Sequence, residues 1–471
     1  MKYNFWVNIL FAEISGERSL LKRIVSGTVL AFLLIGMLTF AFNIQPAKAS
    51  GTIYIRADGS IDPPDAPIST VDYVTYILTG NISGVNGIVV ERSNIIIDGA
   101  GHTLQGTGSG TGFYLLNIDN VTITRTNIKG FSNGVYLVHS SNNILFENDI
   151  TAIENMGIWL RYSSNNTIYK NNVNATINYD GIYLQYSSNF NSISSNNLTN
   201  NRSGVQLSDS SNNSISGNKI ENNNAGVWLR GSSNYDCIEG NNITANHEWG
   251  ILLLSHYNSI KGNNITASVY GIQLGTIFGG SADYNSISEN NIIANDIAIA
   301  IEVASSNRFY HNNFIDNKGP HFILYGTNGT SGGNIWDNGY PSGGNYWSSY
   351  EDTDQFSGPY QNETGSDGIC DTSYILSEYD WGGHYVGNID HYPLMGMFSD
   401  FNATSEYHVQ TICNSTISDF QFNGTAICFN VSGEDGKVGF CRICIPTALL
   451  KETYKVFVNG TEVPYILLPC S

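Results

Sequence analysis

A repeat of about 23 residues constrains the fold of this chain more than any other feature of its sequence. Each copy starts with glycine, then valine or isoleucine, then a variable residue and leucine. The seven glycines are Gly134, Gly157, Gly181, Gly204, Gly226, Gly250 and Gly271, at spacings of 23, 24, 23, 22, 24 and 21 residues. An eighth copy, Ile299–Asn307, lacks the glycine and follows an insertion near Phe278. A fixed period of this length indicates a solenoid, in which each repeat packs on its neighbours.

Each repeat contains two extended pieces and no helical periodicity. One piece is Gly-Val/Ile-x-Leu, and the other alternates as in the segment 213–220, NSISGNKI. Apolar residues at every second position are typical of strands. We therefore predict an all-β fold, a right-handed parallel β-helix solenoid. Leucine-rich repeats are the alternative at this length, but they need more leucines and a helical segment in each unit.

Asparagines recur at one turn of the repeat. They are Asn148, Asn171, Asn196, Asn218, Asn241, Asn263, Asn290 and Asn312. Asparagine tolerates left-handed backbone geometry at turns. Coils stacked ~4.8 Å apart also allow each side-chain amide to form a hydrogen bond with the equivalent asparagine of the next coil. We predict that these asparagines are structural.

The repeat divides the chain into five parts. We expect a signal peptide at 1–49, an N-terminal cap with irregular coils at 50–133 and regular repeats at 134–319. A C-terminal cap with an Asp-rich loop follows at 320–397, and then a small immunoglobulin-like β-sandwich domain at 398–471. The signal rests on an apolar run from 24 to 42 and the cleavage pattern Ala47-Lys48-Ala49. An uncleaved membrane anchor is the alternative, because the run is long.

Export and composition limit the partners. The net charge is -19 although only 13% of residues are charged, which argues against nucleic acid and anionic lipid. We expect a protein secreted to the cell envelope or beyond, with no membrane contact once the signal is removed. Export permits disulfides among the seven cysteines and glycosylation at Asn-x-Ser/Thr sequons. The Cys441-x-x-Cys444 spacing does not predict a zinc site, because positions i and i+3 of a strand face opposite sides.

Alternation in the Gly-Val/Ile-x-Leu piece places its third residue on the outside. The outward positions and those just after them form an aromatic stripe with interspersed arginines. The candidate carbohydrate-binding residues are Tyr136, Trp159, Arg161, Tyr162, Tyr183, Tyr186, Trp228 and Arg230. Aromatic rings offer flat faces on which sugar rings stack, so the stripe predicts polysaccharide binding. The alternative is that aromatic residues merely stabilise the sheet.

Catalysis would require a suitable pair of carboxylates on this stripe. Glycosidases use two carboxylates ~5–9.5 Å apart, and Asp180 and Asp209 are the weak candidates. The signatures of polygalacturonases and pectate lyases, such as Asn-Thr-Asp or Gly-His-Gly, are not found. The sequence therefore favours a non-catalytic binder, with a polysaccharide lyase or glycoside hydrolase as the alternative.

The chain resembles the NosD-type β-helix family, the periplasmic copper-binding proteins, and its archaeal secreted members in particular. The resemblance covers about 51–397 and rests on the segments 53–61 (IYIRADGSI) and 98–102 (DGAGH), the SSNN repeats, and 344–348 (GNYWS). The family typically follows Tyr-Trp-Ser with alternating aspartates, a pattern suited to Ca²⁺. In this chain that pattern is split, and the candidate metal ligands are Asp352, Asp354, Asp367 and Asp371.

The resemblance also implies copper delivery for nitrous oxide reductase, which the residues do not support. Soft copper sites need clusters of Met and Cys, and the mature chain has only Met156, Met395 and Met397. The leading hypothesis is thus a secreted NosD-like β-helix that binds carbohydrate or a cell-surface polymer. A purely structural or adhesive envelope protein is a further alternative. The sequence does not specify the oligomeric state.

Overall fold

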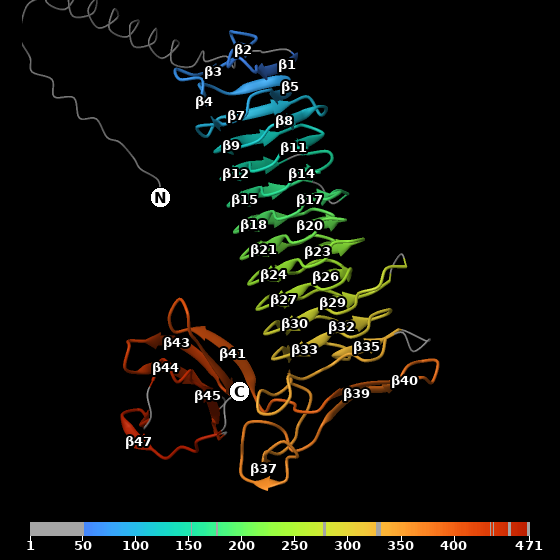
Figure 1. Ribbon diagram of the computed structural model, residues 1–471, viewed down its shortest axis with the longest axis vertical. Helices are drawn as coiled ribbons and strands as arrows, with labels where there is room; N and C mark the ends of the chain where they lie inside the picture. The colour runs from blue at the N-terminus through green and yellow to red at the C-terminus, as the bar shows by residue number, and fades with distance from the viewer. Residues whose placement is uncertain are drawn as a thin grey trace, which may run out of the picture. The chain divides into compact units, whose positions relative to one another are not determined.

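The computed structural model describes residues 51–151, 153–175, 178–276, 279–325, 331–433, 435–436, 438–450 and 454–468. The expected signal peptide lies outside these residues. Among the described residues, no helix is long and apolar enough to cross a membrane. The described secondary structure consists of strands and turns (Figure 1).

Each regular coil contributes three short strands. The first series is β10 (Asn127–Lys129), β13 (Asp149–Thr151), β16 (Asn172–Asn174), β19 (Asn197–Thr199), β22 (Lys219–Glu221), β25 (Asn242–Thr244), β28 (Asn264–Thr266), β31 (Asn291–Ile293) and β34 (Asn313–Ile315). The second is β8 (Thr111–Leu116), β11 (Asn133–Val138), β14 (Ile158–Arg161), β17 (Ile182–Gln185), β20 (Ser203–Ser208), β23 (Ala225–Arg230), β26 (Trp249–Leu254), β29 (Tyr270–Leu274), β32 (Ile297–Ile301) and β35 (Phe322–Leu324). The third is β9 (Val121–Thr124), β12 (Ile144–Phe146), β15 (Thr167–Tyr169), β18 (Ser192–Ser194), β21 (Ser214–Ser216), β24 (Cys237–Glu239), β27 (Ser259–Lys261), β30 (Ser286–Ser288) and β33 (Arg308–Tyr310).

Every strand pairs in parallel with its equivalent in the next coil, as β17 does with β20 and β18 with β21. The predicted all-β solenoid is confirmed. The sequence predicted two extended pieces per repeat, and the structure divides the second piece in two. In the coil of β21 and β22, the break falls at Gly217, whose φ of 60° turns the chain between the strands.

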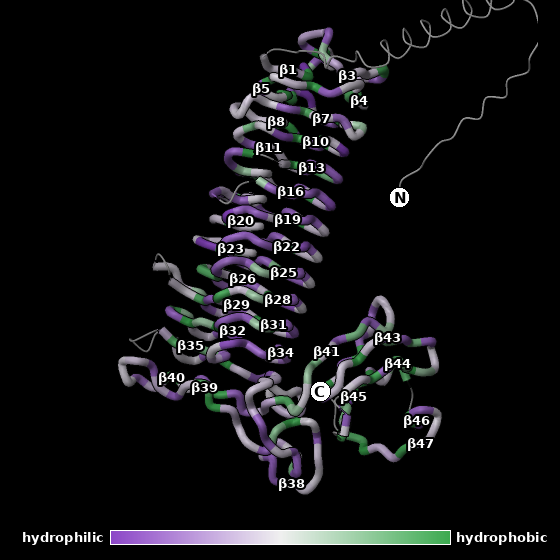
Figure 2. Tube along the Cα trace, turned by 180° about the vertical axis from the view of Figure 1, so that it is seen from behind, coloured by the Kyte–Doolittle hydropathy of each residue, from purple (hydrophilic) through white to green (hydrophobic). Residues whose placement is uncertain are grey.

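The core is a single apolar cluster inside the coils. Inward residues such as Val205, Leu207, Ile215 and Ile220 are fully buried. Hydrophilic residues prevail along the turns (Figure 2). The predicted alternation thus separates the core from the surface in every coil.

The asparagine ladder is present. Asn218 donates its side-chain N–H to Asn241 Oδ1 over 2.9 Å and accepts from Asn196 over 3.0 Å. Its amide also donates to the backbone oxygen of Ile193. The expected left-handed geometry lies one residue earlier than predicted, at Gly217 and its equivalents, because the asparagine itself turns inward to bond its neighbours.

The N-terminal coils are less regular. Their strands are β1 (Gly51–Ile55), β2 (Ile61–Asp62), β3 (Ile68–Ser69), β4 (Thr75–Leu78), β5 (Ile82–Val90), β6 (Ile95–Asp98) and β7 (Thr103–Gly106). Strand β1 pairs in parallel with β5 and antiparallel with the short β2. An antiparallel hairpin at this end fits the predicted cap, since it leaves less of the terminal coil unpaired.

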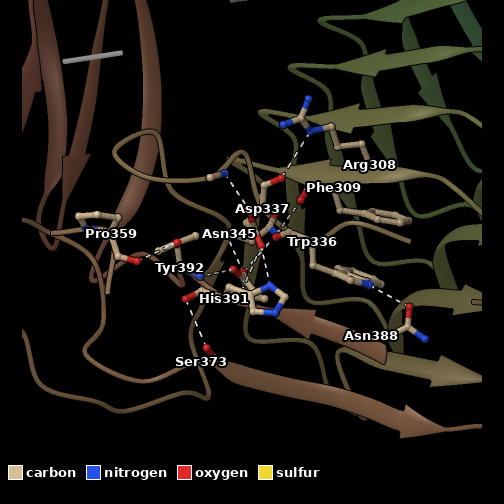
Figure 3. A network of polar contacts seen from close by, with 12 residues as sticks. Arg308, Phe309, Trp336, Asp337, Asn345, Pro359, Ser373, Asn388, His391 and Tyr392 are labelled. Carbon is tan, nitrogen blue, oxygen red and sulfur yellow. Dashed lines mark hydrogen bonds and ion pairs between the residues drawn. The ribbon is translucent and has the colours of Figure 1, made fainter. Parts of the chain in front are cut away.

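At the other end, two tryptophans close the core. The ring of Trp336 stacks on Phe309 and that of Trp347, in β36 (Tyr346–Trp347), on Phe314, each with centroids 4.1 Å apart. Trp336 also donates to Asn388 Oδ1 over 3.0 Å (Figure 3). The remaining cap strands are β37 (Phe356–Ser357), β38 (Glu363–Thr364), β39 (Tyr374–Tyr379) and β40 (Tyr385–Asp390).

After the cap come small antiparallel sheets. Their strands are β41 (Met397–Asn402), β42 (His408–Cys413), β43 (Thr416–Phe422), β44 (Ile427–Ser432), β45 (Cys441–Cys444), β46 (Val456–Val458) and β47 (Thr461–Val463). Phe401 of β41 stacks on Phe420 of β43 at 4.6 Å, so a three-stranded sheet contacts a two-stranded one. The small C-terminal β-domain is thus built of antiparallel sheets, and its immunoglobulin-like topology stays a prediction. Cys444 is disulfide-bonded, whereas Cys413 and Cys441 are free thiols at opposed positions.

Candidate functional site

The second strand series carries the predicted stripe in register. Parallel pairing aligns Tyr114, Tyr136, Trp159, Tyr183, Gln206 and Trp228 across six successive coils. We call the outward side chains of β11, β14, β17, β20 and β23, with the turn residues directly after these strands, the ladder face. Sequence alternation therefore identified the correct side of the solenoid.

The rings of the ladder face stack on one another. Tyr136 and Trp159 lie with centroids 4.3 Å apart and planes within 14°, and Tyr183 follows Trp159 at 6.3 Å. Ring faces that pack together are closed to a sugar ring, so this row does not present the open stacking platform that the sequence suggested. It presents ring edges and polar tips instead.

Two residues of the row are covered. Tyr183 is 4% exposed and Gln206 is 0% exposed, although neither belongs to the solenoid core. Arg230 Nη2 donates to the Tyr183 hydroxyl over 3.2 Å, and Arg202 Nη2 donates to Gln206 Oε1 over 3.1 Å. Alternation predicts which side a residue faces, but it does not show that long side chains from the same coil or from other coils lie over it.

A second row of rings follows at the turn after these strands. His139 and Tyr162 stack at 4.8 Å, and Tyr162 and Tyr186 at 5.5 Å. Tyr162 is 41% exposed and Tyr186 is 38% exposed. The guanidinium of Arg161 lies 5.5 Å and 5.2 Å from these two ring centroids, a cation–π arrangement. The hydrogen bond with Tyr136 raises the pKa of Arg161 above its ordinary value.

Asp180 is buried beneath the face and paired with Arg202. The carboxylate is 0% exposed and accepts two hydrogen bonds from Arg202, of 3.1 Å from Nε and 2.6 Å from Nη2. Burial raises the pKa of Asp180, and the bonds from Arg202 oppose that shift. Burial disfavours the charge of Arg202, but the hydrogen bond with Asp180 and the attraction of its charge together outweigh burial, so the pKa of Arg202 is raised. Sequence reasoning missed Arg202, although it lies 22 residues after Asp180, one repeat further on.

The structure does not bring Asp180 and Asp209 together. The pairing of Gln185 with Ser208 places Asp209 beside position 186, six residues along the chain from Asp180. At ~3.3 Å per residue, this separation is on the order of 15–20 Å, beyond the reach of a glycosidase pair. Asp209 accepts from the Ser232 backbone over 3.1 Å and from the Ser208 hydroxyl over 3.2 Å.

Four N–H-bearing groups of the ladder face lack a hydrogen-bond acceptor among the described residues. They are Trp159 Nε1, Arg161 Nε, Gln206 Nε2 and Arg230 Nε. Buried polar atoms are nearly always paired, so four unpaired donors on one face are unusual. Unpaired atoms elsewhere on the coils, such as Asn197 Oδ1 and Asp236 Oδ2, are acceptors.

A separate aromatic row, which sequence reasoning missed, occupies the turn before the third strand series. Tyr235, Tyr257 and Tyr284 stack at 5.2 Å and 5.1 Å, and Phe190 occupies the equivalent turn two coils before Tyr235. We call these four residues the tyrosine corner. They are 46% to 61% exposed. One sequence feature could have identified them: each lies one residue before the Asn or Asp that starts the second extended piece of its repeat.

The four aspartates of the predicted calcium site accept hydrogen bonds from their own loop. Asp354 accepts from the N–H groups of Asp367 and Gly368 over 2.9 Å and 2.8 Å, and Asp371 from those of Gln355 and Phe356. Asp352 accepts from the Thr372 N–H over 2.8 Å. In the described part of the chain, no three His, Cys, Asp or Glu side chains gather closely enough to hold a metal ion. Calcium would have to displace these bonds, and the site stays a prediction.

Comparison with protein families gives two matches. Residues 74–220 match the family described as right handed beta helix region. Residues 174–352 match the family described as periplasmic copper-binding protein (NosD). The chain carries NosD and right-handed β-helix domains. The resemblance drawn from the repeats and the Gly-Asn-Tyr-Trp-Ser segment is confirmed.

The copper in the NosD description has no donor set on the ladder face, whose strands contain neither Cys nor Met. Soft sulfur ligands occur elsewhere. Cys370 Sγ lies 3.4 Å from Met395 Sδ in the cap. Cys413 stands opposite Met397 and Cys441 in the sheet that follows. The ladder face therefore does not fit copper.

Solved structures with a similar fold include the A-modules of two Azotobacter vinelandii mannuronan C-5 epimerases. AlgE4 is 18% identical with a TM-score of 0.46, covering 58% of this chain and 89% of that one. AlgE6 is 17% identical with a TM-score of 0.47, covering 61% and 91%. The periplasmic alginate epimerase AlgG is 15% identical with a TM-score of 0.44, covering 59% and 81%. At these values the matches carry no argument about function. No curated protein sequence matches the chain.

Proposed function

We propose that this protein is an extracytoplasmic NosD-type β-helix that binds a polysaccharide or similar surface polymer along its ladder face, without catalysis. The observation that carries the proposal is the set of four unpaired donors at Trp159, Arg161, Gln206 and Arg230. Unpaired buried donors cost free energy unless a partner supplies acceptors. Sugar hydroxyl and ring oxygens are such acceptors.

The repeating geometry favours a polymer over a small ligand. Equivalent positions of the face recur with each coil, ~4.8 Å apart, and the donors extend from the coil of β14 to that of β23. A chain lying along the solenoid would meet successive coils. The edges of Tyr136 and Trp159 line the same path.

The carboxylates support binding rather than hydrolysis or elimination. Asp180 is held by Arg202, and Asp209 lies several residues away along the strand direction. A lyase or hydrolase is the alternative that a product assay tests. The expected export segment at 24–49 and the periplasmic description of the NosD family support the proposed location.

The experiment compares two double variants in pull-downs on insoluble glycans. Trp159→Ala with Trp228→Ala alters the ladder face, whereas Tyr257→Ala with Tyr284→Ala alters the tyrosine corner by the same kind of truncation. We expect the first to lose retention and the second to keep it, with melting curves showing that both are folded. Equal retention of both variants would contradict the proposal. New reducing ends or unsaturated products would establish the enzyme alternative, and no retention of the wild-type protein would favour a structural role.

A further inference from the structure

Two arginines of the ladder face converge on one coil. The guanidinium of Arg161, from β14, lies 5.2 Å from the ring centroid of Tyr186, one coil on. Arg230, from β23, reaches back two coils to the hydroxyl of Tyr183. Both groups therefore contact residues of the coil that contains β17, although their backbones are three coils, about 14 Å, apart. Arg161 also contacts Tyr162 of its own coil and Tyr136 of the coil before.

Neither arginine has a carboxylate partner within the described residues. The ion pairs there include Arg202 with Asp180 but none with Arg161 or Arg230. Two carboxylates belong to this region. Asp180 is engaged by Arg202, and Asp209 accepts from Ser208 and Ser232. In a chain of net charge -19, two guanidinium groups without an ion-pair partner on one face add local positive charge, of which Arg230 also acts at longer range on Asp180.

The four unpaired nitrogen atoms around them all donate. Trp159 Nε1, Gln206 Nε2 and the Nε atoms of both arginines carry hydrogens and have no lone pair to offer. Neutral sugar hydroxyls both donate and accept hydrogen bonds. Next to these donors they can only accept, so their own O–H groups find no partner there. Carboxylate and sulfate oxygens only accept, and they form the stronger charge-assisted bonds with guanidinium.

We propose that the ladder face selects an acidic polysaccharide, and that Arg161 and Arg230 together bind its carboxylate or sulfate groups over the coil of β17. This rests on the proposed function and specifies the ligand class of the same face. Nucleic acid is the other polyanion, but its dense charge is disfavoured by a protein of charge -19.

The test uses one polymer backbone in two charge states. Polygalacturonic acid and its fully methyl-esterified form share the sugar chain and differ in the carboxylate. Binding of the full chain is measured by affinity electrophoresis at two salt concentrations, alongside dextran sulfate, dextran and single-stranded DNA. The variant is Arg161→Gln with Arg230→Gln, and the matched control is Lys129→Gln with Lys170→Gln, which removes the same charge elsewhere on the solenoid.

We expect the wild-type protein and the lysine control to bind the acid form at least about tenfold more tightly than the ester, with salt weakening the acid form only. The arginine variant should lose this preference. Equal binding of acid and ester by the wild-type protein would overturn the acidic class and leave glycan binding intact. Tighter binding of DNA than of any acidic glycan would also overturn it. Binding of none of the polymers would contradict the proposed function as well.

Discussion

The ladder face and the tyrosine corner are two aromatic surfaces on one solenoid, and they differ in how well their polar atoms are paired. The corner is the more exposed: Tyr235 is 61% exposed, whereas Tyr183 of the face is 4% exposed. Beneath the corner, a ladder of side-chain amides bonds coil to coil, for example from Asn285 to Asn307 over 3.0 Å. The face instead retains unpaired donors. Exposure of aromatic rings thus does not by itself identify the candidate binding surface, whereas the unpaired N–H donors of the ladder face do.

The largest effect is expected at Asp236, where the corner ladder has an aspartate in place of asparagine. Asp236 Oδ1 accepts from the Asn213 backbone over 2.7 Å, but Oδ2 is buried without a partner among the described residues. Burial raises the pKa of Asp236 to about 8. The carboxyl group therefore stays protonated in the folded chain at pH 7, while it ionises in the unfolded chain.

Asp236→Asn should stabilise the protein by on the order of 3–4 kcal/mol at pH 7. Below pH ~4 the Asp236 carboxyl is protonated in both the folded and the unfolded wild-type protein, so its full contribution to the free energy of unfolding is present. That contribution is lost as the pH rises through about 8. Urea unfolding of both proteins between pH 4 and 9 checks this. A pH-independent difference in midpoint would show that Asp236 does not titrate as the structure indicates.

The next effect tests whether the corner is structural. Asn285→Ala removes the acceptor of the Asn258 N–H, at 2.8 Å, and the donor to the Ser255 carbonyl, at 3.1 Å. Leaving these buried groups unpaired should cost about 2–3 kcal/mol. Urea unfolding measures the loss, with Lys129→Gln as the control that should unfold like the wild-type protein. If the variant is as stable as the wild-type protein, the amide ladder does not stabilise the solenoid and the corner is not structural.

A smaller effect is expected on the face. Gln206→Leu removes a buried donor without a partner but also the acceptor of Arg202 Nη2, so stability should change by less than about 1 kcal/mol. Binding of the acidic polymer should weaken, because that donor is lost to the ligand. Thermal melting and affinity electrophoresis on the same preparation give both values. A marked loss of stability together with unchanged binding would show that Gln206 has a structural role, like the amides beneath the tyrosine corner.

The smallest effect is expected for Tyr257→Ala. This ring stacks between Tyr235 and Tyr284, and cross-strand ring pairs contribute roughly 0.2–1 kcal/mol each. Melting should fall slightly while glycan retention stays unchanged. A marked loss of retention would assign binding to the corner.

The sequence predicted the solenoid, its parallel register and the side of each alternating residue, because Gly-Val/Ile-x-Leu repeats with a fixed period. It did not predict what lies across the surface. Tyr183 is covered by Arg230, two coils on, and Gln206 by Arg202 of its own coil. The separation of Asp180 from Asp209 depends on exact register. The small sheets after the cap follow no repeat, so their strand pairing could not be predicted.

The central claim is that the ladder face, and not the tyrosine corner, contacts the polymer. Hydroxyl-radical footprinting with and without polygalacturonic acid tests it directly, since the exposed tyrosines of both surfaces are oxidisable. We expect oxidation of Tyr162 and Tyr186 to slow when the polymer binds, while Tyr235, Tyr257 and Tyr284 react as before. Protection of the corner tyrosines with Tyr162 and Tyr186 unchanged would contradict the account.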